Sequence, residues 1–400
     1  MAKASLLGRS GDDAPELDPH QDPFSEAAIR HLVSRYGSPL FIIDAERVRA
    51  QYRRLAAALP GVDLHYALKP LPHSAVINTL AAEGSYFDLA TNGEVDLMRR
   101  LKIAPERCIH THPIKRDSDI RTALAYGVKR FVVDNPDELR KFVKFRSRAE
   151  LLIRVSFRSA DAVVDLSRKF GCAQEDAESL FRLAAELRIR VAGLSFHAGS
   201  QAADSRRMVS AIGICATLLE HAAAAGHPAS ILDIGGGFPV DYLGRAQPIE
   251  EFCAPIREAL ERLPRHIRII AEPGRYLSAP AAIAVASVMG RAERDGQWWY
   301  YLDDGLYGSY SGQIYDHSVY PVEVLAAGPT YPSVLAGPTC DSIDVIREKL
   351  ELPKLKMGDL VVGRAMGAYT WASASDFNFF PRATILALDR GRLLYSRADR

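Results

Sequence analysis

The sequence has few cysteines, no excess of either charge and no long apolar run. Its five cysteines are scattered and form no Cys-x-x-Cys pair, which argues against a disulfide framework or a zinc site. The 50 basic and 49 acidic residues leave a net charge of +1, so neither nucleic acid nor an anionic membrane is favoured as a partner. No window reaches the length of a transmembrane helix, and residues 1–22 lack the apolar core of a signal peptide. We therefore expect a cytoplasmic protein.

Metal binding is not expected either. His110 and His112 alternate along a β-prone segment, but no third ligand with suitable spacing stands nearby. Ordinary strand histidines explain them better, and we predict no metal site.

Short β-prone runs alternate with amphipathic segments of helical spacing, such as 136–145, 173–188 and 206–225. Eight such alternations predict an α/β fold, a (β/α)8 barrel of the TIM type, with an open doubly wound sheet as the alternative. The predicted barrel strands are residues 64–69, 85–90, 108–113, 130–134, 150–157, 191–198, 231–236 and 267–272.

After Arg275 the helical periodicity nearly disappears, and Gly, Pro and Asp-Gly turns separate short strands. This pattern predicts a C-terminal all-β domain, a barrel or sandwich. We assign residues 1–36 to an N-terminal arm that is flexible at its start, 37–278 to the barrel and 279–400 to the β domain, to which a strand at 38–43 is a candidate addition. The strands expected in that domain are 281–288, 298–302, 321–325, 333–336, 359–362 and 384–388.

Charged or glycine-rich features stand at the carboxyl ends of six predicted barrel strands. In a barrel these ends meet at one mouth, where catalytic groups lie. Buried charges are costly unless they are paired or used, so their shared register indicates a common site. The features are Lys69, Asp88, Arg154, His197, the run Gly235, Gly236 and Gly237, and Glu272.

Lys69 ends an apolar strand, where desolvation is expected to lower its pKa and leave a free amine. A free amine forms a Schiff base with an aldehyde. The glycine run allows backbone N–H groups to converge on an anion, and its spacing is not the Gly-x-Gly-x-x-Gly of a dinucleotide site. We interpret the run as a phosphate site.

Glu272 on a buried strand end needs a cation, and a protonated pyridine nitrogen is one candidate. Arg275, beside Gly274, could reach a phosphate. His197 could lie flat on a cofactor, with Ser200 donating to its phosphate. Together with Lys69, these groups suit pyridoxal phosphate.

The sequence resembles the fold-type III pyridoxal-phosphate decarboxylases, most closely the ornithine/lysine decarboxylase branch. The resemblance spans residues 38–390 in order, which makes it specific. The matching segments are 66–69, 87–90, 168–171, 195–200, 232–239, 271–276, 304–309, 315–317, 337–341 and 366–370.

The resemblance implies a role for each matching residue. Lys69 would bind the aldehyde of pyridoxal 5'-phosphate, Glu272 would keep the pyridine nitrogen protonated, and His197 would stack on the ring. Cys340 would return a proton to Cα, and a homodimer would complete each site with the partner's Cys340 loop. The remaining cofactor residues would be Asp88, Arg154, Ser200, Gly235, Gly236, Gly237, Gly274, Arg275 and Tyr369, and the substrate residues Tyr315, Asp316 and Asp341.

The implied reaction is decarboxylation of L-ornithine, L-lysine or both to a diamine. One alternative is a modified basic amino acid or a diaminopimelate-like substrate, but a second carboxylate would need a cation, and residues 313–319 contain no arginine. A second is a non-catalytic homologue of the antizyme-inhibitor kind, which would have lost cofactor residues. A racemase would use a tyrosine in place of the Cys340 and Asp341 pair.

Overall fold

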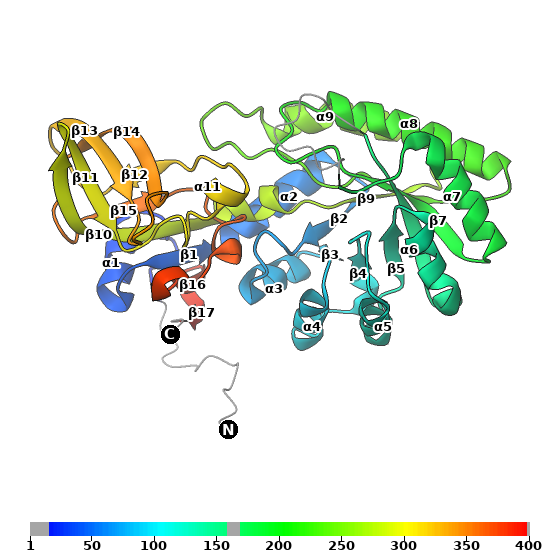
Figure 1. Cartoon of the computed structure of the whole chain (residues 1–400), viewed down its shortest axis with the longest axis horizontal. Helices are drawn as coiled ribbons and strands as arrows, with labels where there is room; N and C mark the ends of the chain where they lie inside the picture. The colour runs from blue at the N-terminus through cyan, green and yellow to red at the C-terminus, as the bar shows by residue number, and fades with distance from the viewer. Residues whose placement is uncertain (1–15, 158–168, 398–400) are drawn as a thin grey trace, which may run out of the picture.

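The computed structural model describes residues 16–157 and 169–397 and shows a barrel beside a strand-rich domain (Figure 1). Residues 1–15 of the predicted arm, Arg168 of one matching segment and residues 398–400 lie outside the described residues. The barrel and its helices occupy one end of the elongated molecule, and the β domain occupies the other.

Strands β2 to β9 close into a barrel of parallel strands in chain order, which confirms the (β/α)8 prediction. Its interior holds a buried layer of side chains: Ile109, Val132, Leu152, Ala192, Ile231 and Ile270. Since successive side chains of a strand face opposite ways, the residues next to this layer face the surrounding helices. The strands are β2 (Val62–Ala67), β3 (Tyr86–Leu89), β4 (Cys108–His110), β5 (Arg130–Val133), β6 (Glu150–Val155), β7 (Arg190–Phe196), β8 (Ile231–Asp233) and β9 (Arg268–Ala271).

The helices between these strands have conventional start signals. Thr91 and Glu94 form a capping box at α4, and Asn135 caps α6 with Pro136 in its first turn. The helices are α3 (Ser74–Ala82), α4 (Asn92–Arg100), α5 (Asp117–Tyr126), α6 (Pro136–Lys141), α7 (Gln174–Glu186), α8 (Arg206–Ala224), α9 (Ile249–Glu261) and α10 (Arg275–Ser278).

The C-terminal part contributes eight strands, β10 to β17, to a nine-stranded sheet, which confirms the predicted all-β domain. Asp295 and Gly296, both at positive φ, make the tight hairpin between β10 and β11. Two of the strands, β14 and β17, escaped sequence reasoning. The elements are β10 (Ala282–Arg294), β11 (Gln297–Leu302), α11 (Gly312–Tyr315), β12 (Val322–Val324), β13 (Thr330–Ala336), β14 (Val345–Pro353), β15 (Leu360–Gly363), β16 (Thr384–Asp389) and β17 (Arg392–Arg397).

The N-terminal segment belongs to this sheet as well. β1 (Leu40–Asp44) pairs antiparallel with β10 and parallel with β16. Within the segment assigned as an arm, α1 (Glu26–Tyr36) begins at the N-cap Ser25 and buries Ile29 and Leu32 in the same apolar cluster as the sheet. The chain then enters the barrel through α2 (Ala45–Ala58).

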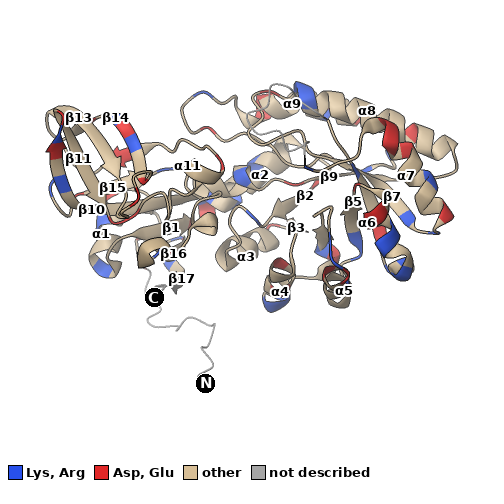
Figure 2. Ribbon diagram, in the orientation of Figure 1, with Lys and Arg blue, Asp and Glu red and all other residues tan. Residues whose placement is uncertain are grey.

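Charges of both signs alternate over the helical surface of the barrel (Figure 2), as the near-zero net charge leads one to expect. None of the helices in the described part of the chain combines the length and apolar character that a membrane span requires.

Candidate active site

Lys69 lies just beyond β2, at the carboxyl end of the barrel, and solvent reaches its side chain. The strands around it are joined by backbone hydrogen bonds: Leu68 N–H donates to the Asp88 carbonyl. Tyr369 raises the pKa of Lys69, and the nearby carboxylates of Asp88 and Glu272 add to this against the effect of burial. The expected lowering of this pKa was therefore wrong for the cofactor-free chain, because the neighbouring groups outweigh desolvation.

Two carboxyl groups meet at the ends of β8 and β9. Asp233 is fully buried; its Oδ1 accepts the Gly235 N–H at 2.9 Å and its Oδ2 has no partner among the described residues. Glu272 Oε1 is likewise buried and unpaired. Burial raises the pKa of Asp233 to about 7, and burial followed by the Asp233 charge raises the pKa of Glu272 well above its usual range. Arg154 partly offsets both upward shifts in pKa, and Lys69 does so for Glu272.

Sequence reasoning named Glu272 but not Asp233 as a site residue. The available signal was position: Asp233 ends a barrel strand, as Asp88 does. The sequence could not reveal that Asp233 and Glu272 approach each other, because that depends on the adjacency of β8 and β9.

His197 follows β7 and lies against the glycine run. Its Nδ1 accepts the Gly199 N–H at 3.0 Å. Burial, with Arg154 and Lys69 nearby, lowers the pKa of His197 to about 3, so the ring is neutral. A Cβ on Gly235 would lie 2.2 Å from the Phe196 carbonyl oxygen.

The glycine run passes so close to neighbouring backbone that side chains are excluded. A Cβ on Gly236 would lie 2.7 Å from the Glu272 carbonyl oxygen, and one on Gly237 would lie 2.2 Å from that of Gly199. Gly237 also has φ +102°, which disfavours other residues. Gly274 likewise packs tightly, since its Cβ would lie 2.7 Å from Pro70 Cγ. We call Gly235, Gly236, Gly237 and Gly274 the glycine cradle: each requires glycine because neighbouring atoms already occupy the place of a Cβ.

Arg275 is the cation beside this cradle and is 5% exposed. Its guanidinium donates to Ser200 Oγ at 3.1 Å and Tyr242 Oη at 3.3 Å, and it lies 4.8 Å from the centroid of the Tyr369 ring. A cavity of about 990 Å³ borders Ser200, Tyr242 and Arg275. Arg275 Nε has no partner among the described residues, so the guanidinium has capacity for an anion.

Asp316 also contacts Arg275, since its Oδ2 lies 2.6 Å from a guanidinium nitrogen and accepts the Ser318 hydroxyl at 2.7 Å. The substrate-binding role expected for Asp316 stays a prediction, and this ion pair was not expected. It places Asp316 at the edge of the cavity that borders Arg275.

Asp88 lies in β3 and Arg154 in β6, near the carboxyl ends of these strands. Asp88 accepts the Thr111 hydroxyl at 2.5 Å, and burial followed by Glu272 raises the pKa of Asp88 well above its usual range. The Arg154 guanidinium lies 5.7 Å from the Phe170 ring centroid. Thr111 and Phe170 were not assigned site roles from the sequence, because their contacts are with the side chains of Asp88 and Arg154.

The predicted site residues of the β domain fall into two groups. Tyr369 joins the barrel site, because its backbone N–H donates to the Pro70 carbonyl and its ring lies beside Arg275. Cys340 and Asp341 are not buried, and Asp341 accepts the Tyr307 hydroxyl at 2.5 Å within the β domain. Tyr315 is 64% exposed. No contact among the described residues of one chain joins Cys340 to Lys69.

The arrangement can be compared with known proteins. The family model described as "Pyridoxal-dependent decarboxylase, pyridoxal binding domain" matches residues 45–279. Lysine/ornithine decarboxylase of Selenomonas ruminantium is 35% identical over 368 residues, covering 92% of this chain and 94% of that protein. Antizyme inhibitor 2 of Xenopus laevis is 34% identical over 365 residues, covering 86% of this chain and 80% of that protein.

Solved structures agree with these matches. Lysine/ornithine decarboxylase from Vibrio vulnificus in complex with putrescine is 54% identical, with a TM-score of 0.88, over 91% of this chain and 98% of that chain. The complex of the same protein with cadaverine is 53% identical, also with a TM-score of 0.88, over 92% and 98%.

Proposed function

Because the chain belongs to the pyridoxal-dependent decarboxylase family, we propose that it removes the α-carboxylate of L-ornithine, L-lysine or both and releases the diamine. Its cofactor is pyridoxal phosphate. The Vibrio vulnificus relative binds putrescine and cadaverine, the diamines of these two amino acids, which supports this substrate class. The observation that carries the proposal is the buried Glu272 Oε1 near Lys69, which has no partner among the described residues, since a pyridine N–H would supply a donor to it.

The residues fit the cofactor at each of its polar ends. Lys69 would bind the aldehyde and Glu272 the ring nitrogen. Asp233 would orient Glu272 through the contact between their carboxyl groups. The phosphate would lie at the cradle of Gly235, Gly236, Gly237 and Gly274, with Ser200, Arg275 and Tyr369. The unpaired Arg275 Nε, on a guanidinium that borders the cavity beside Ser200, supports this assignment.

The cofactor supplies an electron sink for the pair of electrons left when carbon dioxide departs. The chain supplies the rest. Glu272 would hold a proton at the ring nitrogen, His197, which is neutral, would cover the ring without adding charge, and Asp88 and Arg154 would support the ring. Lys69 would hold the aldehyde end of the cofactor, and Cys340 would deliver a proton to Cα.

Substrate selection would depend on the carboxylates that bind the end of the substrate farthest from its α-carbon. Asp316 and Asp341, with Tyr315 beside them, would hold the distal ammonium of a diamino acid. A diaminopimelate-like substrate would bring a second carboxylate against them, and residues 313–319 offer no arginine to receive it. A modified basic amino acid is compatible with the same carboxylates and is therefore the alternative substrate.

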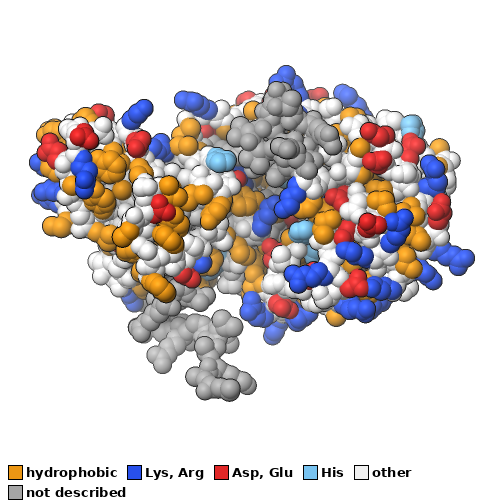
Figure 3. All heavy atoms as spheres, viewed as in Figure 1, with side chains coloured by type: hydrophobic (Ala, Val, Ile, Leu, Met, Phe, Trp, Pro, Cys, Tyr) orange, Lys and Arg blue, Asp and Glu red, His pale blue; other side chains and the backbone are white. Residues whose placement is uncertain are grey.

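We propose a homodimer in which the partner subunit contributes the Cys340 loop. Within one chain Cys340 and Asp341 are not buried, and the hydrogen bond that Asp341 accepts comes from Tyr307 of its own domain. Large exposed apolar side chains lie in the same domain, where hydrophobic surface is visible in Figure 3: Tyr315, Val319, Ile343, Phe377 and Phe379. Such a surface is typical of a protein interface. The five free cysteines support a reducing compartment, the cytoplasm.

The test is carbon dioxide release across L-ornithine, L-lysine, L-arginine, diaminopimelate and the D-isomers, with pyridoxal phosphate present. Release from L-ornithine or L-lysine with a kcat/KM at least tenfold above the others is the expected result. If the protein neither binds the cofactor nor releases carbon dioxide from any of them, a non-catalytic role of the antizyme-inhibitor kind replaces the proposed function. Preference for diaminopimelate would refute the roles of Asp316 and Asp341.

A further inference from the structure

Lys115 is a buried lysine outside the group of residues described above. It lies in the loop after β4 and is 3% exposed. Its Nζ donates to three backbone carbonyls, those of His112 at 2.8 Å, Pro113 at 2.9 Å and Val132 at 2.6 Å. All three ammonium donors are therefore satisfied.

The Lys115 ammonium lies where two neighbouring barrel strands share little backbone pairing. β4 and β5 are paired at a single position, His110 with Phe131, whereas β5 and β6 are paired at four. Pro113 has no N–H to extend the ladder. The Lys115 side chain supplies a donor to the Val132 carbonyl of β5 and to two carbonyls of the segment after β4, so it joins the carboxyl ends of both strands.

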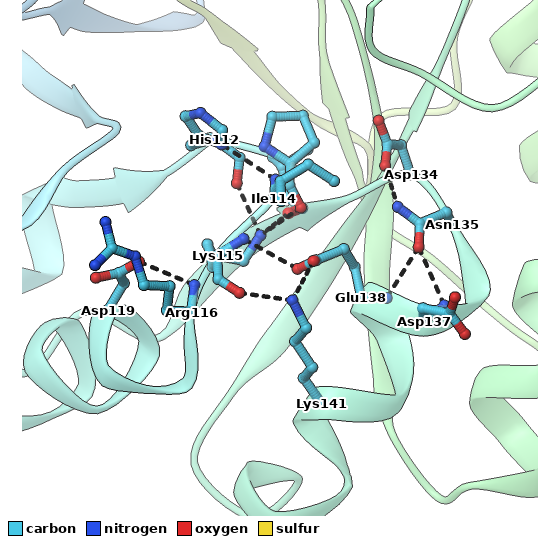
Figure 4. Close-up of polar contacts among 12 residues, drawn as sticks. His112, Ile114, Lys115, Arg116, Asp119, Asp134, Asn135, Asp137, Glu138 and Lys141 are labelled. Atoms are coloured by element: carbon cyan, nitrogen blue, oxygen red, sulfur yellow. Dashed lines mark hydrogen bonds and ion pairs between the residues drawn. The ribbon is translucent and has the colours of Figure 1, made fainter.

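Helix α6 holds Lys115 from the other side, as Figure 4 shows. Glu138 Oε2 accepts the Lys115 N–H at 3.1 Å, and Lys141 Nζ donates to the Lys115 carbonyl at 2.7 Å and pairs with Glu138. Burial lowers the pKa of Lys115 to about 7, opposed by Glu138 and Asp134. A charge buried at this cost needs all of these partners.

We call Lys115, Glu138 and Lys141 the clamp. Two contacts connect this clamp with the active site. Thr111, four residues before Lys115, donates to Asp88 at 2.5 Å. The His112 ring packs edge-on against Phe170, with centroids 5.4 Å apart, and Phe170 lies beneath the Arg154 guanidinium. Asp88 in turn acts on Lys69.

We infer that Lys115 is a positioning residue of the decarboxylase: it fixes the segment after β4 so that Thr111 orients Asp88 and His112 supports Arg154 through Phe170. Because Asp88 and Arg154 have proposed roles, this inference rests on the proposed function. Wild-type protein that neither binds pyridoxal phosphate nor releases carbon dioxide would refute the function itself. A defect confined to variants of the clamp tests Lys115 alone.

The experiment compares Lys115→Met with Lys144→Met in the full chain. Lys144 is half exposed and pairs with Asp117 at the start of α5. Lys115→Met should lower kcat roughly 100-fold, the scale of an ångström-sized misplacement, while KM changes little. The pH dependence of the visible absorbance of the bound cofactor should also shift, whereas Lys144→Met should behave as wild type. A folded Lys115→Met with wild-type kcat and absorbance would overturn the inference.

Two further variants decide the matter if Lys115→Met does not fold. Thr111→Val leaves the clamp intact and removes the link to Asp88, so it should reproduce the loss of kcat. Lys115→Arg keeps the charge and N–H donors and should retain kcat within about tenfold of wild type, because loss of one hydrogen bond is expected to cost no more. Wild-type kcat in Thr111→Val would overturn the inference, and so would an inactive but folded Lys115→Arg.

Discussion

Replacing Asp233 by asparagine should stabilise the cofactor-free protein by an amount that grows from about pH 4 and is complete above about pH 7. Asp233 is fully buried, one of its oxygens is unpaired, and Glu272 is its neighbour. Asparagine keeps an acceptor for the Gly235 N–H and removes one of the two carboxyl groups. It therefore removes the unfavourable charge while nearly preserving shape.

The magnitude follows from the pKa of Asp233, which burial raises from 3.8 to about 7. At about 1.4 kcal/mol per pKa unit, ionising this group in the fold costs at most roughly 4 kcal/mol. Because the folded pKa exceeds the unfolded one, the folded state binds more protons between these values. The free energy of unfolding should thus fall from about pH 4 to about pH 7, with the full cost present above that range.

The assay is urea unfolding of protein prepared without pyridoxal phosphate, followed by far-ultraviolet circular dichroism across this pH range. Asp233→Asn should exceed wild type by roughly 2–4 kcal/mol above pH 7 and by much less near pH 4. Asp137→Asn, at an exposed position on α6, is the control and should stay within about 0.5 kcal/mol of wild type at both ends. An Asp233→Asn variant with the pH dependence of wild type would refute the assignment of the buried proton.

Further predictions concern the proposed reaction. Lys69→Ala should lose both carbon dioxide release and the visible absorbance of lysine-bound cofactor; an absorbance that persists would show that another group holds the aldehyde. Asp316→Ala should raise KM for the diamino acid roughly 10- to 100-fold, the value of one charge-assisted hydrogen bond, with little change in cofactor affinity measured by titration. Equal effects on both would contradict a substrate role. Cys340→Ala should retain the cofactor but give slower or misdirected protonation, seen as a carbonyl by-product in product analysis, and an unchanged product ratio and rate would remove Cys340 from the mechanism.

Sequence periodicity predicted the barrel well because each strand and helix carries its own local signal. The run before Lys69 and the Asn135-Pro136 start of α6 are examples. The site was anticipated through register, since polar residues at equivalent strand ends must share one mouth. Elements with weaker local patterns, such as α1, β14 and β17, were not identified.

The connectivity of the β domain was harder to predict. The strand at 38–43 was a candidate for that domain from composition alone, whereas its position between β10 and β16 depends on pairing over more than 200 residues of intervening chain. Local sequence carries no record of such pairing, because hydrogen bonds between backbones are the same for any side chains.

By itself the sequence determined which chemical groups lie at the mouth of the barrel: an amine, carboxylates, an imidazole and a glycine cradle. The tertiary structure decided how they act on one another. It set the direction of the Lys69 pKa through Tyr369, brought Asp233 against Glu272 and paired Arg275 with Asp316. It also placed the Lys115 ammonium between β4 and β5. The physical reason is that charge interactions depend on distance and burial, and both are fixed only when distant segments close into the barrel.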